Sequence, residues 1–238
     1  MSCYISIDLD YFTSLSWSGS TIFNTKKNYR SFFKKLFSLC VPTLLVESHE
    51  HILEHVNSYP SDILYNMDYH NDVFPYEKDK DDYITKFEQQ LTCGNWGNHV
   101  DWRSDAEFVW CLPDKYECWE KGYGDCNECM GRYSDISLFP STYRDKQKFH
   151  KKVIQDFIWG KYRISSQLPV LKDVHAVGIC LSIDYIEHYD LAFLADIFTN
   201  ALDNNKIQFG KDMSQKIFDM YFSLEKYETH KEELVANY

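Results

Sequence analysis

Apolar and polar positions follow two patterns along the chain. Continuous apolar runs bounded by turn residues are typical of strands that are buried on both faces. Such runs predict strands at residues 3–9, 43–46, 63–67, 106–112 and 174–183. Between the strands, apolar residues recur at helical spacing, as they do from Phe32 to Cys40 opposite Lys34 and Lys35. This spacing predicts a first helix that ends before Pro42 and further helices at about residues 50–58, 83–91, 146–159, 191–202 and 213–235.

The alternation of strands with helices predicts the fold class. We expect an α/β protein with three αβα layers, in which helices cover both faces of a mostly parallel sheet. All residues, 1–238, are expected to form a single domain, with an acidic loop at 77–82 and a Cys-, Gly- and Tyr-rich insertion at about 113–142. Ligands of such sheets bind at the carboxyl ends of the strands, so functional residues are expected there.

Composition and charge narrow the class of partner. Hydrophobic residues make up 44% of the chain and charged residues 26%, which excludes a disordered or coiled-coil protein. The formal net charge of -11 disfavours nucleic acids and anionic membranes and favours a cationic partner. No basic segment precedes an apolar stretch at the amino terminus, and no apolar run approaches the roughly 18 residues of a membrane span. We therefore expect a cytoplasmic protein that binds neither nucleic acid nor membrane.

Potential metal ligands follow four of the predicted strands: Asp8 with Asp10, His49, Asp68 with His70 and Asp72, and Asp184 with Glu187. Residues two apart face the same side of a strand, so Asp8 and Asp10 can point to one place, as can Asp68 and His70. An Asp-x-Asp pair alone is usually turn or cap chemistry, whereas Asp-x-His-x-Asp is more specific. Several ionised carboxylates that converge in a buried place require a multivalent cation. The number of carboxylates and imidazoles suits two divalent ions.

These strings resemble known signatures. Asn-Met-Asp68-Tyr-His70-Asn-Asp72 resembles the Asp-Ala-His-x-Asp signature of the arginase and ureohydrolase superfamily. Val-Glu-Ser-His49-Glu is similar to its Gly-Gly-Asp-His-Ser segment, and Ser-Ile-Asp8-Leu-Asp10-Tyr-Phe is similar to its Asp-x-Asp segment. The chain also contains Gly-Asn-Trp at residues 94–96, and this set of strings is similar to that of a smaller arginase-like, ureohydrolase-related family that includes peptide arginases.

The resemblance implies a fold and a ligand set. The Asp-x-Asp string comes first in this chain and last in ordinary arginases, which implies an arginase/deacetylase-like fold that is circularly permuted. It implies two Mn²⁺ ions, and an oxygen-rich set of ligands favours the same metal independently. The implied ligands are Asp8, Asp10, His49, Asp68, His70 and Asp72.

The implied activity is that of a hydrolase acting on a guanidinium group. The chain would convert peptidyl arginine to ornithine and urea in a ribosomally made precursor peptide, with Asp72 as a catalytic residue and His99 as the general acid. Asp184, and after it Glu187, would bind the substrate guanidinium, because Val-Gly-Ile-Cys-Leu-Ser-Ile-Asp184-Tyr-Ile-Glu187 is like a late arginase strand. Residues 73–101 show no recognisable clamp for the α-groups of free arginine, which favours a peptide.

The sequence also fits other functions. The chain could be a ureohydrolase acting on free arginine or agmatine, or another metal-dependent C–N hydrolase such as a deacetylase-like enzyme. It could also be a precursor-binding protein that keeps a metal for stability without turnover, and His99 could be a loop histidine without a role. The eight cysteines are expected to be reduced thiols, although Cys118, Cys126 and Cys129 have spacing that a structural Zn²⁺ could use. A homodimer is expected.

Overall fold

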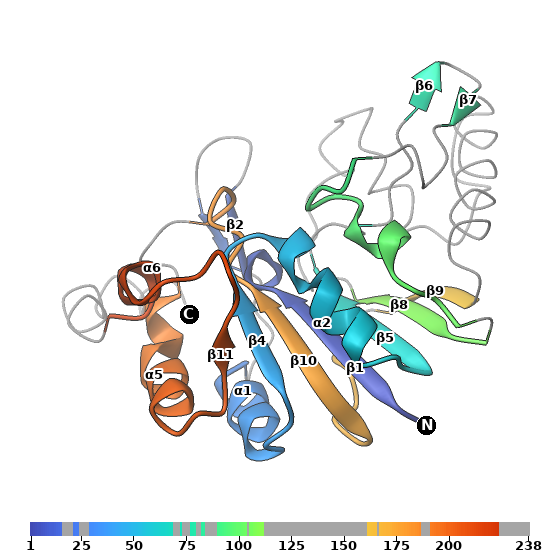
Figure 1. Ribbon diagram of the computed structural model, residues 1–238. Coiled ribbons are helices and arrows are strands. Elements are labelled where there is room, and N and C mark those ends of the chain that lie inside the picture. Colours follow the sequence, from blue (N-terminus) through green and yellow to red (C-terminus); the bar gives the residue numbers. More distant parts are fainter. Residues whose placement is uncertain are drawn as a thin grey trace.

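The computed structural model describes residues 1–15, 21–23, 29–68, 72, 77–79, 82–83, 90–103, 105–111, 161–165, 167–186 and 191–223. Its centre is a seven-stranded sheet with the order β11-β4-β10-β1-β5-β8-β9, and every neighbouring pair is parallel (Figure 1). The strands are β1 (Cys3–Asp8), β4 (Thr43–Val46), β5 (Ile63–Met67), β8 (Glu107–Cys111), β9 (Lys161–Ser165), β10 (Val174–Cys180) and β11 (Gln208–Phe209). The middle strand, β1, is buried along its whole length.

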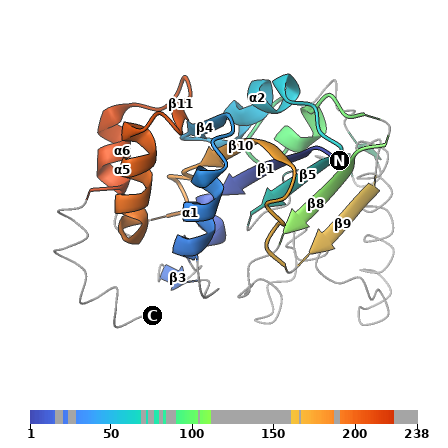
Figure 2. The ribbon, with the colours of Figure 1, turned by 90° about the horizontal axis from the view of Figure 1, so that it is seen from below.

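Helices cover both faces of this sheet, as the view in Figure 2 shows for α1 and α2. On one face lie α1 (Tyr29–Ser38), α5 (Ala195–Asp203) and α6 (Gln215–Tyr221). On the other lie α2 (Leu53–Ser58) and the 3₁₀ turns η2 (His49–Ile52) and η3 (Trp96–His99). Two more 3₁₀ turns are η1 (Leu9–Tyr11) and η5 (Ala192–Leu194). The predicted three-layer α/β fold is confirmed.

Two apolar clusters explain the layers. Ile5 and Ile7 of β1 belong to a cluster with the apolar residues of α1, α5 and α6. Tyr4, which faces the opposite side of β1, belongs to a second cluster with apolar residues of α2, η2 and η3. Gly178 on β10 makes room there, because a Cβ at this position would lie 2.6 Å from the Tyr4 hydroxyl. The continuous apolar strands of the sequence are therefore buried on both faces, as parallel sheets require.

Most predicted elements are present with nearly the expected bounds. The strands at 43–46 and 63–67 match β4 and β5, and the 191–202 helix corresponds to η5 and α5. Neither β9 nor β11, which lie at the two edges of the sheet, was predicted. The 77–82 segment, expected to be a loop, contains β6 (Glu77–Asp79) and the start of β7 (Asp82–Tyr83), which pair antiparallel. Tyr83 therefore does not open the helix expected at 83–91, and residues 84–89 of that helix lie outside the described residues. A further antiparallel pair is β2 (Thr13–Leu15) with β3 (Thr21–Phe23).

Other predictions are corrected or lie outside the described residues. The last helix is shorter than expected within the described part, because α6 ends at Tyr221. Its first turn is capped by Ser214, whose Oγ accepts a hydrogen bond from the Ile217 N–H. The 146–159 helix, the 113–142 insertion and the cysteines Cys118, Cys126 and Cys129 lie outside the described residues. Within the described ranges, no helix has the length and apolarity that crossing a membrane requires.

Candidate metal centre

A polar cluster lies at the carboxyl edge of the sheet, on the face that α2 covers. Ser6 and Asp8 follow Tyr4 at alternate positions of β1, so all three face the same side. Asn66 and Asp68 follow Leu64 in the same way at the end of β5. The apolar residues of this face thus give way to polar ones where the strands end, and all four polar side chains are buried. Parallel strands place these ends next to one another.

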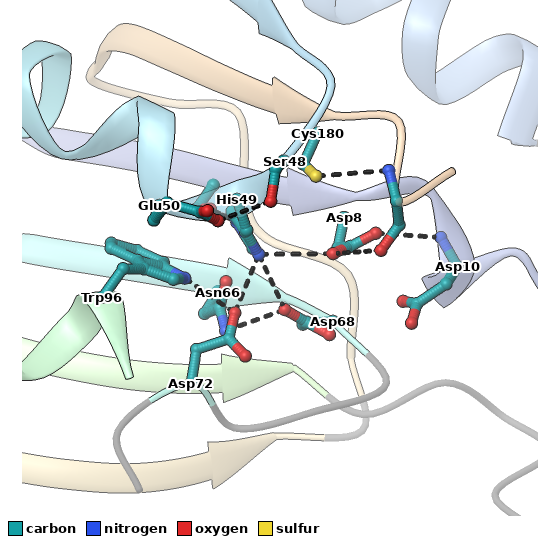
Figure 3. Close-up of polar contacts among 12 residues, drawn as sticks. Asp8, Asp10, Ser48, His49, Glu50, Asn66, Asp68, Asp72, Trp96 and Cys180 are labelled. Carbon is teal, nitrogen blue, oxygen red and sulfur yellow. Dashed lines mark hydrogen bonds and ion pairs between the residues drawn. The ribbon is translucent and has the colours of Figure 1, made fainter. Parts of the chain in front are cut away.

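His49 lies at the centre of the cluster. It is the first residue of η2, which follows β4 after Glu47 and Ser48. Its Nδ1 lies 2.8 Å from Asp72 Oδ2, 3.1 Å from Asp68 Oδ2 and 3.3 Å from Asp8 Oδ2 (Figure 3). Its other nitrogen, Nε2, lies 2.6 Å from Ser6 Oγ. When the ring carries a single proton, we assign it to Nε2, which donates to Ser6 and leaves the Nδ1 lone pair available to a metal ion. A histidine with one nitrogen anchored and the other directed at carboxylates is oriented as a metal ligand.

The carboxylates form two groups that share one residue. Ligand atoms of His49, Asp68 and Asp72 lie within 4.8 Å of one another, as do those of Asp8, Asp10 and Asp68. Asp68 belongs to both groups, and all five side chains are buried. The cluster can therefore bind a metal ion, since it offers carboxylate and imidazole ligands at separations that one ion can span.

Neighbouring side chains fix the orientation of these ligands. Trp96 Nε1 donates to Asp72 Oδ2 at 2.7 Å, and its indole ring packs beside the His49 ring at a centroid distance of 4.9 Å. Ser182 Oγ donates to Asp8 Oδ2 at 2.9 Å. Asp72 and Ser182 both have a positive φ, of 55°, which is uncommon for residues with a side chain and is often found at functional sites. The polar contacts of the cluster thus extend beyond its ligands.

The pKa values reflect the crowding of like charges. Burial raises the pKa of Asp68 well above its ordinary value, and the nearby charges of Asp72, Asp8 and Asp10 raise it further. Burial alone would lower the pKa of His49, but the surrounding carboxylates outweigh it and raise this pKa well above its ordinary value. In the absence of a cation the cluster therefore retains protons, and a divalent cation would replace them.

No protein-family model matches this sequence, and neither a curated protein nor a solved structure matches the chain. The geometry of the cluster is therefore the basis for the functional argument.

The structure brings together five of the six predicted ligands, namely Asp8, Asp10, His49, Asp68 and Asp72. The sixth, His70, lies outside the described residues, as does Glu187. Asp184 is exposed in the turn that follows β10, at the same edge of the sheet as the cluster. His99 is half-buried and ends η3, the turn that begins with Trp96. The roles of these four residues stay predictions.

Several supporting residues were not predicted. Ser6 and Asn66 could have been found, because each is a polar residue in an otherwise apolar strand, two positions before a carboxylate ligand. Asp212 had no such signal. It lies between β11 and α6, and its Oδ2 accepts hydrogen bonds from the backbone N–H groups of Glu47 and Ser48 at 2.9 and 3.0 Å. The same oxygen lies 2.6 Å from His51 Nδ1, so His51 faces Asp212.

Proposed function

We propose that this chain is a dimanganese hydrolase that converts arginine side chains of a peptide to ornithine and releases urea. The observation that carries the proposal is the position of Asp68, which belongs to both groups of ligand atoms. A carboxylate shared in this way can bridge two ions. Most of the ligand atoms are oxygens, which suits Mn²⁺ better than Zn²⁺ or Cu²⁺.

The ligand set divides naturally between two ions. His49, Asp68 and Asp72 would hold the first ion and Asp8, Asp10 and Asp68 the second, since the ligand atoms of each group lie within 4.8 Å of one another. His70, which lies outside the described residues, is the sixth ligand in the proposal. When bound, such a pair supplies Lewis-acid activation of a water molecule and of the guanidinium group.

The chain's own residues would orient the substrate and move one proton. The net charge of -11 attracts a cationic side chain. Asp184, in the turn that follows β10, would bind its guanidinium together with Glu187. In the reaction the water oxygen bonds to the guanidinium carbon as the water loses its two protons, and the bond from that carbon to the side-chain nitrogen of the nascent ornithine breaks. Both protons end on that nitrogen, which leaves as the ammonium group of ornithine. His99 would donate a proton to that nitrogen, and Asp72 would hold its ion through the carboxylate that Trp96 orients.

The proposal includes a cytoplasmic protein that acts as a homodimer on a ribosomally made precursor peptide. A peptide is favoured over free arginine because residues 73–101 show no recognisable clamp for free α-groups. The high aromatic fraction of 17% suits an extended peptide partner.

Mass spectrometry after incubation with Mn²⁺ tests the proposal. Arginine-containing peptides and free L-arginine are compared, and each converted arginine is expected to lose the mass of CN₂H₂ while urea appears in equal amount. Asp68→Ala removes the shared ligand and should abolish the conversion, whereas Asp62→Ala at the other end of β5 should not. Conversion of free arginine alone would point to an ordinary ureohydrolase. Bound metal without urea, from any substrate, would contradict catalysis and leave a metal-stabilised binding protein.

A further inference from the structure

Cys180 is a potential metal ligand at the cluster that the proposed function leaves unused. It is the last residue of β10 and is buried. Its register partner on the neighbouring parallel strand is Asp8, so the two side chains leave the sheet on the same face. The Cys180 Sγ, a carboxylate oxygen of Asp8 and a ring nitrogen of His49 lie within 4.8 Å of one another (Figure 3). One ion can therefore contact all three.

The surroundings of Cys180 hold its sulfur in this position. The backbone N–H of Ser182 lies 3.2 Å from the sulfur, and the thiol donates to the Glu47 carbonyl oxygen at 3.5 Å. Burial and the nearby charge of Asp8 raise the pKa of the Cys180 thiol, although the Ser182 N–H lowers it, so a bound cation is needed to stabilise the thiolate here. The hydroxyl of Ser182 donates to Asp8, so one residue supports two of the three ligands.

The donor set of these three residues differs from that of the remaining cluster. Sulfur, imidazole nitrogen and carboxylate oxygen together are typical ligands of zinc and other thiophilic ions, whereas manganese prefers oxygen. We infer that Asp8, His49 and Cys180 form a second, overlapping site for a thiophilic divalent cation such as Zn²⁺ or Cd²⁺. On binding, the thiol S–H bond breaks, a metal–sulfur bond forms and the proton passes to water.

This site makes the cluster sensitive to the identity of the metal. Because Asp8 and His49 would serve both sets of ligands, a thiophilic ion and a pair of hard ions exclude each other. A thiophilic ion is then an inhibitor of any reaction that needs the hard ions. The inference goes beyond the proposed function, because the site binds its ion whether or not the chain hydrolyses arginine.

Titration with Cd²⁺ tests the inference directly, since cadmium bound to thiolate absorbs in the ultraviolet. The full chain, freed of metal, is titrated as wild type, Cys180→Ser and Cys111→Ser. Cys111 is also buried at the end of a strand, but it belongs to none of the ligand groups in the described part of the chain, so its variant is a matched control.

We expect the wild type and Cys111→Ser to show the same cadmium–thiolate absorption at the first equivalent. Cys180→Ser should lack it and bind Cd²⁺ at least about tenfold more weakly, because a lost ligand costs no less than a lost supporting contact. Excess Mn²⁺ should suppress the absorption in the wild type. Equal absorption and affinity in all three proteins would overturn the inference, since the signal would then come from other cysteines.

Cadmium NMR of the wild type provides a second test if Cys180→Ser fails to fold. A sulfur-ligated resonance that excess Mn²⁺ removes supports the overlapping site. A sulfur-ligated resonance that persists with Mn²⁺, or one with only oxygen and nitrogen ligands, overturns it. Neither result depends on the release of urea, so failure of this inference and failure of the proposed hydrolase are distinguishable.

Discussion

Two aspartates at opposite ends of β5 have opposite environments. At the amino edge of the sheet, Asp62 accepts a hydrogen bond from the Ser2 backbone N–H at 2.7 Å and lies 3.2 Å from an Arg103 guanidinium nitrogen. These contacts, led by the Ser2 hydrogen bond, hold the pKa of Asp62 below its ordinary value. At the carboxyl edge, Asp68 is fully buried among other carboxylates, and burial raises its pKa well above its ordinary value.

The two residues differ in how their charges affect folding: the charge of Asp62 stabilises the fold, whereas the charge of Asp68 costs folding free energy. Asp62 joins the amino terminus to β5 and is partly exposed, so its charge is solvated and paired. Asp68 has a buried charge whose neighbours include three other acidic groups, an arrangement that costs free energy unless a cation or protons compensate it. Such a cost in folding free energy is expected at a site that binds a ligand. Substitutions at the two edges of the sheet should therefore have different effects on stability and on metal affinity.

The largest expected effect is that of Asp68→Asn. The variant removes the carboxylate shared by both groups of ligand atoms, so we expect Mn²⁺ affinity to fall at least about a hundredfold. The metal-free protein should lose no thermal stability, because burial and the neighbouring carboxylates already disfavour the charge of Asp68 and asparagine is a neutral group of the same shape. Calorimetric titration with Mn²⁺ measures the affinity, and thermal unfolding with and without the metal measures the stability. Asp62→Asn is the control, with normal Mn²⁺ affinity and reduced thermal stability. Normal Mn²⁺ affinity in Asp68→Asn together with reduced affinity in Asp62→Asn would contradict the difference between the two edges of the sheet.

Trp96→Phe should have the next largest effect. It removes the N–H that orients Asp72 while keeping an aromatic ring beside His49, so we expect Mn²⁺ affinity to fall about tenfold. Trp102→Phe is the matched control, because its lost N–H bonds the Gly97 backbone carbonyl and no ligand side chain. Calorimetric titration of both variants with Mn²⁺ is the test. Equal losses of Mn²⁺ affinity in the two variants would mean that Trp96 acts through general packing and not through its hydrogen bond to Asp72.

The sequence predicted the central strands and singled out five of the residues that meet in the cluster, because both depend on local patterns. Continuous apolar runs identify β1, β4, β5, β8 and β10, and carboxylates directly after such runs are rare enough to indicate a site. It did not predict β11, which has two residues and pairs with β4 only because the chain returns to the sheet edge. The same return brings Asp212 to Glu47 and Ser48, just before His49, a contact across more than 160 residues that no local pattern encodes.

Asp212→Ala measures how much this long-range contact contributes to the centre. One carboxylate oxygen accepts both backbone N–H groups of Glu47 and Ser48, just before His49, so its loss should loosen that ligand. We expect Mn²⁺ affinity to fall by less than about tenfold, with substantial recovery in Asp212→Asn, whose amide oxygen still accepts hydrogen bonds. The absorption spectrum of the Co²⁺-loaded protein should change in the alanine variant only. Asp62→Ala, which also removes a carboxylate that accepts a backbone N–H, should alter neither measurement.

The smallest expected effect contrasts two histidines. Burial lowers the pKa of His55, which faces the Tyr4 hydroxyl, to about 4, whereas the carboxylates around His49 outweigh burial and raise its pKa. A lowered histidine pKa means that the unfolded chain binds more protons, so the contribution of His55 is lost as the pH falls from about 6.5 towards 4. The contribution of His49 has the opposite sign and is lost as the pH of the metal-free protein rises above 6.5.

Urea unfolding of the metal-free protein between pH 4 and pH 6.5 should therefore be less steeply pH-dependent in His55→Gln than in the wild type. Metal affinity should not change, because the His55 side chain is bound to Tyr4 and not to the cluster. An unchanged slope would show that protonation of His55 does not oppose folding. Changed Mn²⁺ affinity would instead show that the apolar region of this face and its polar edge are energetically coupled.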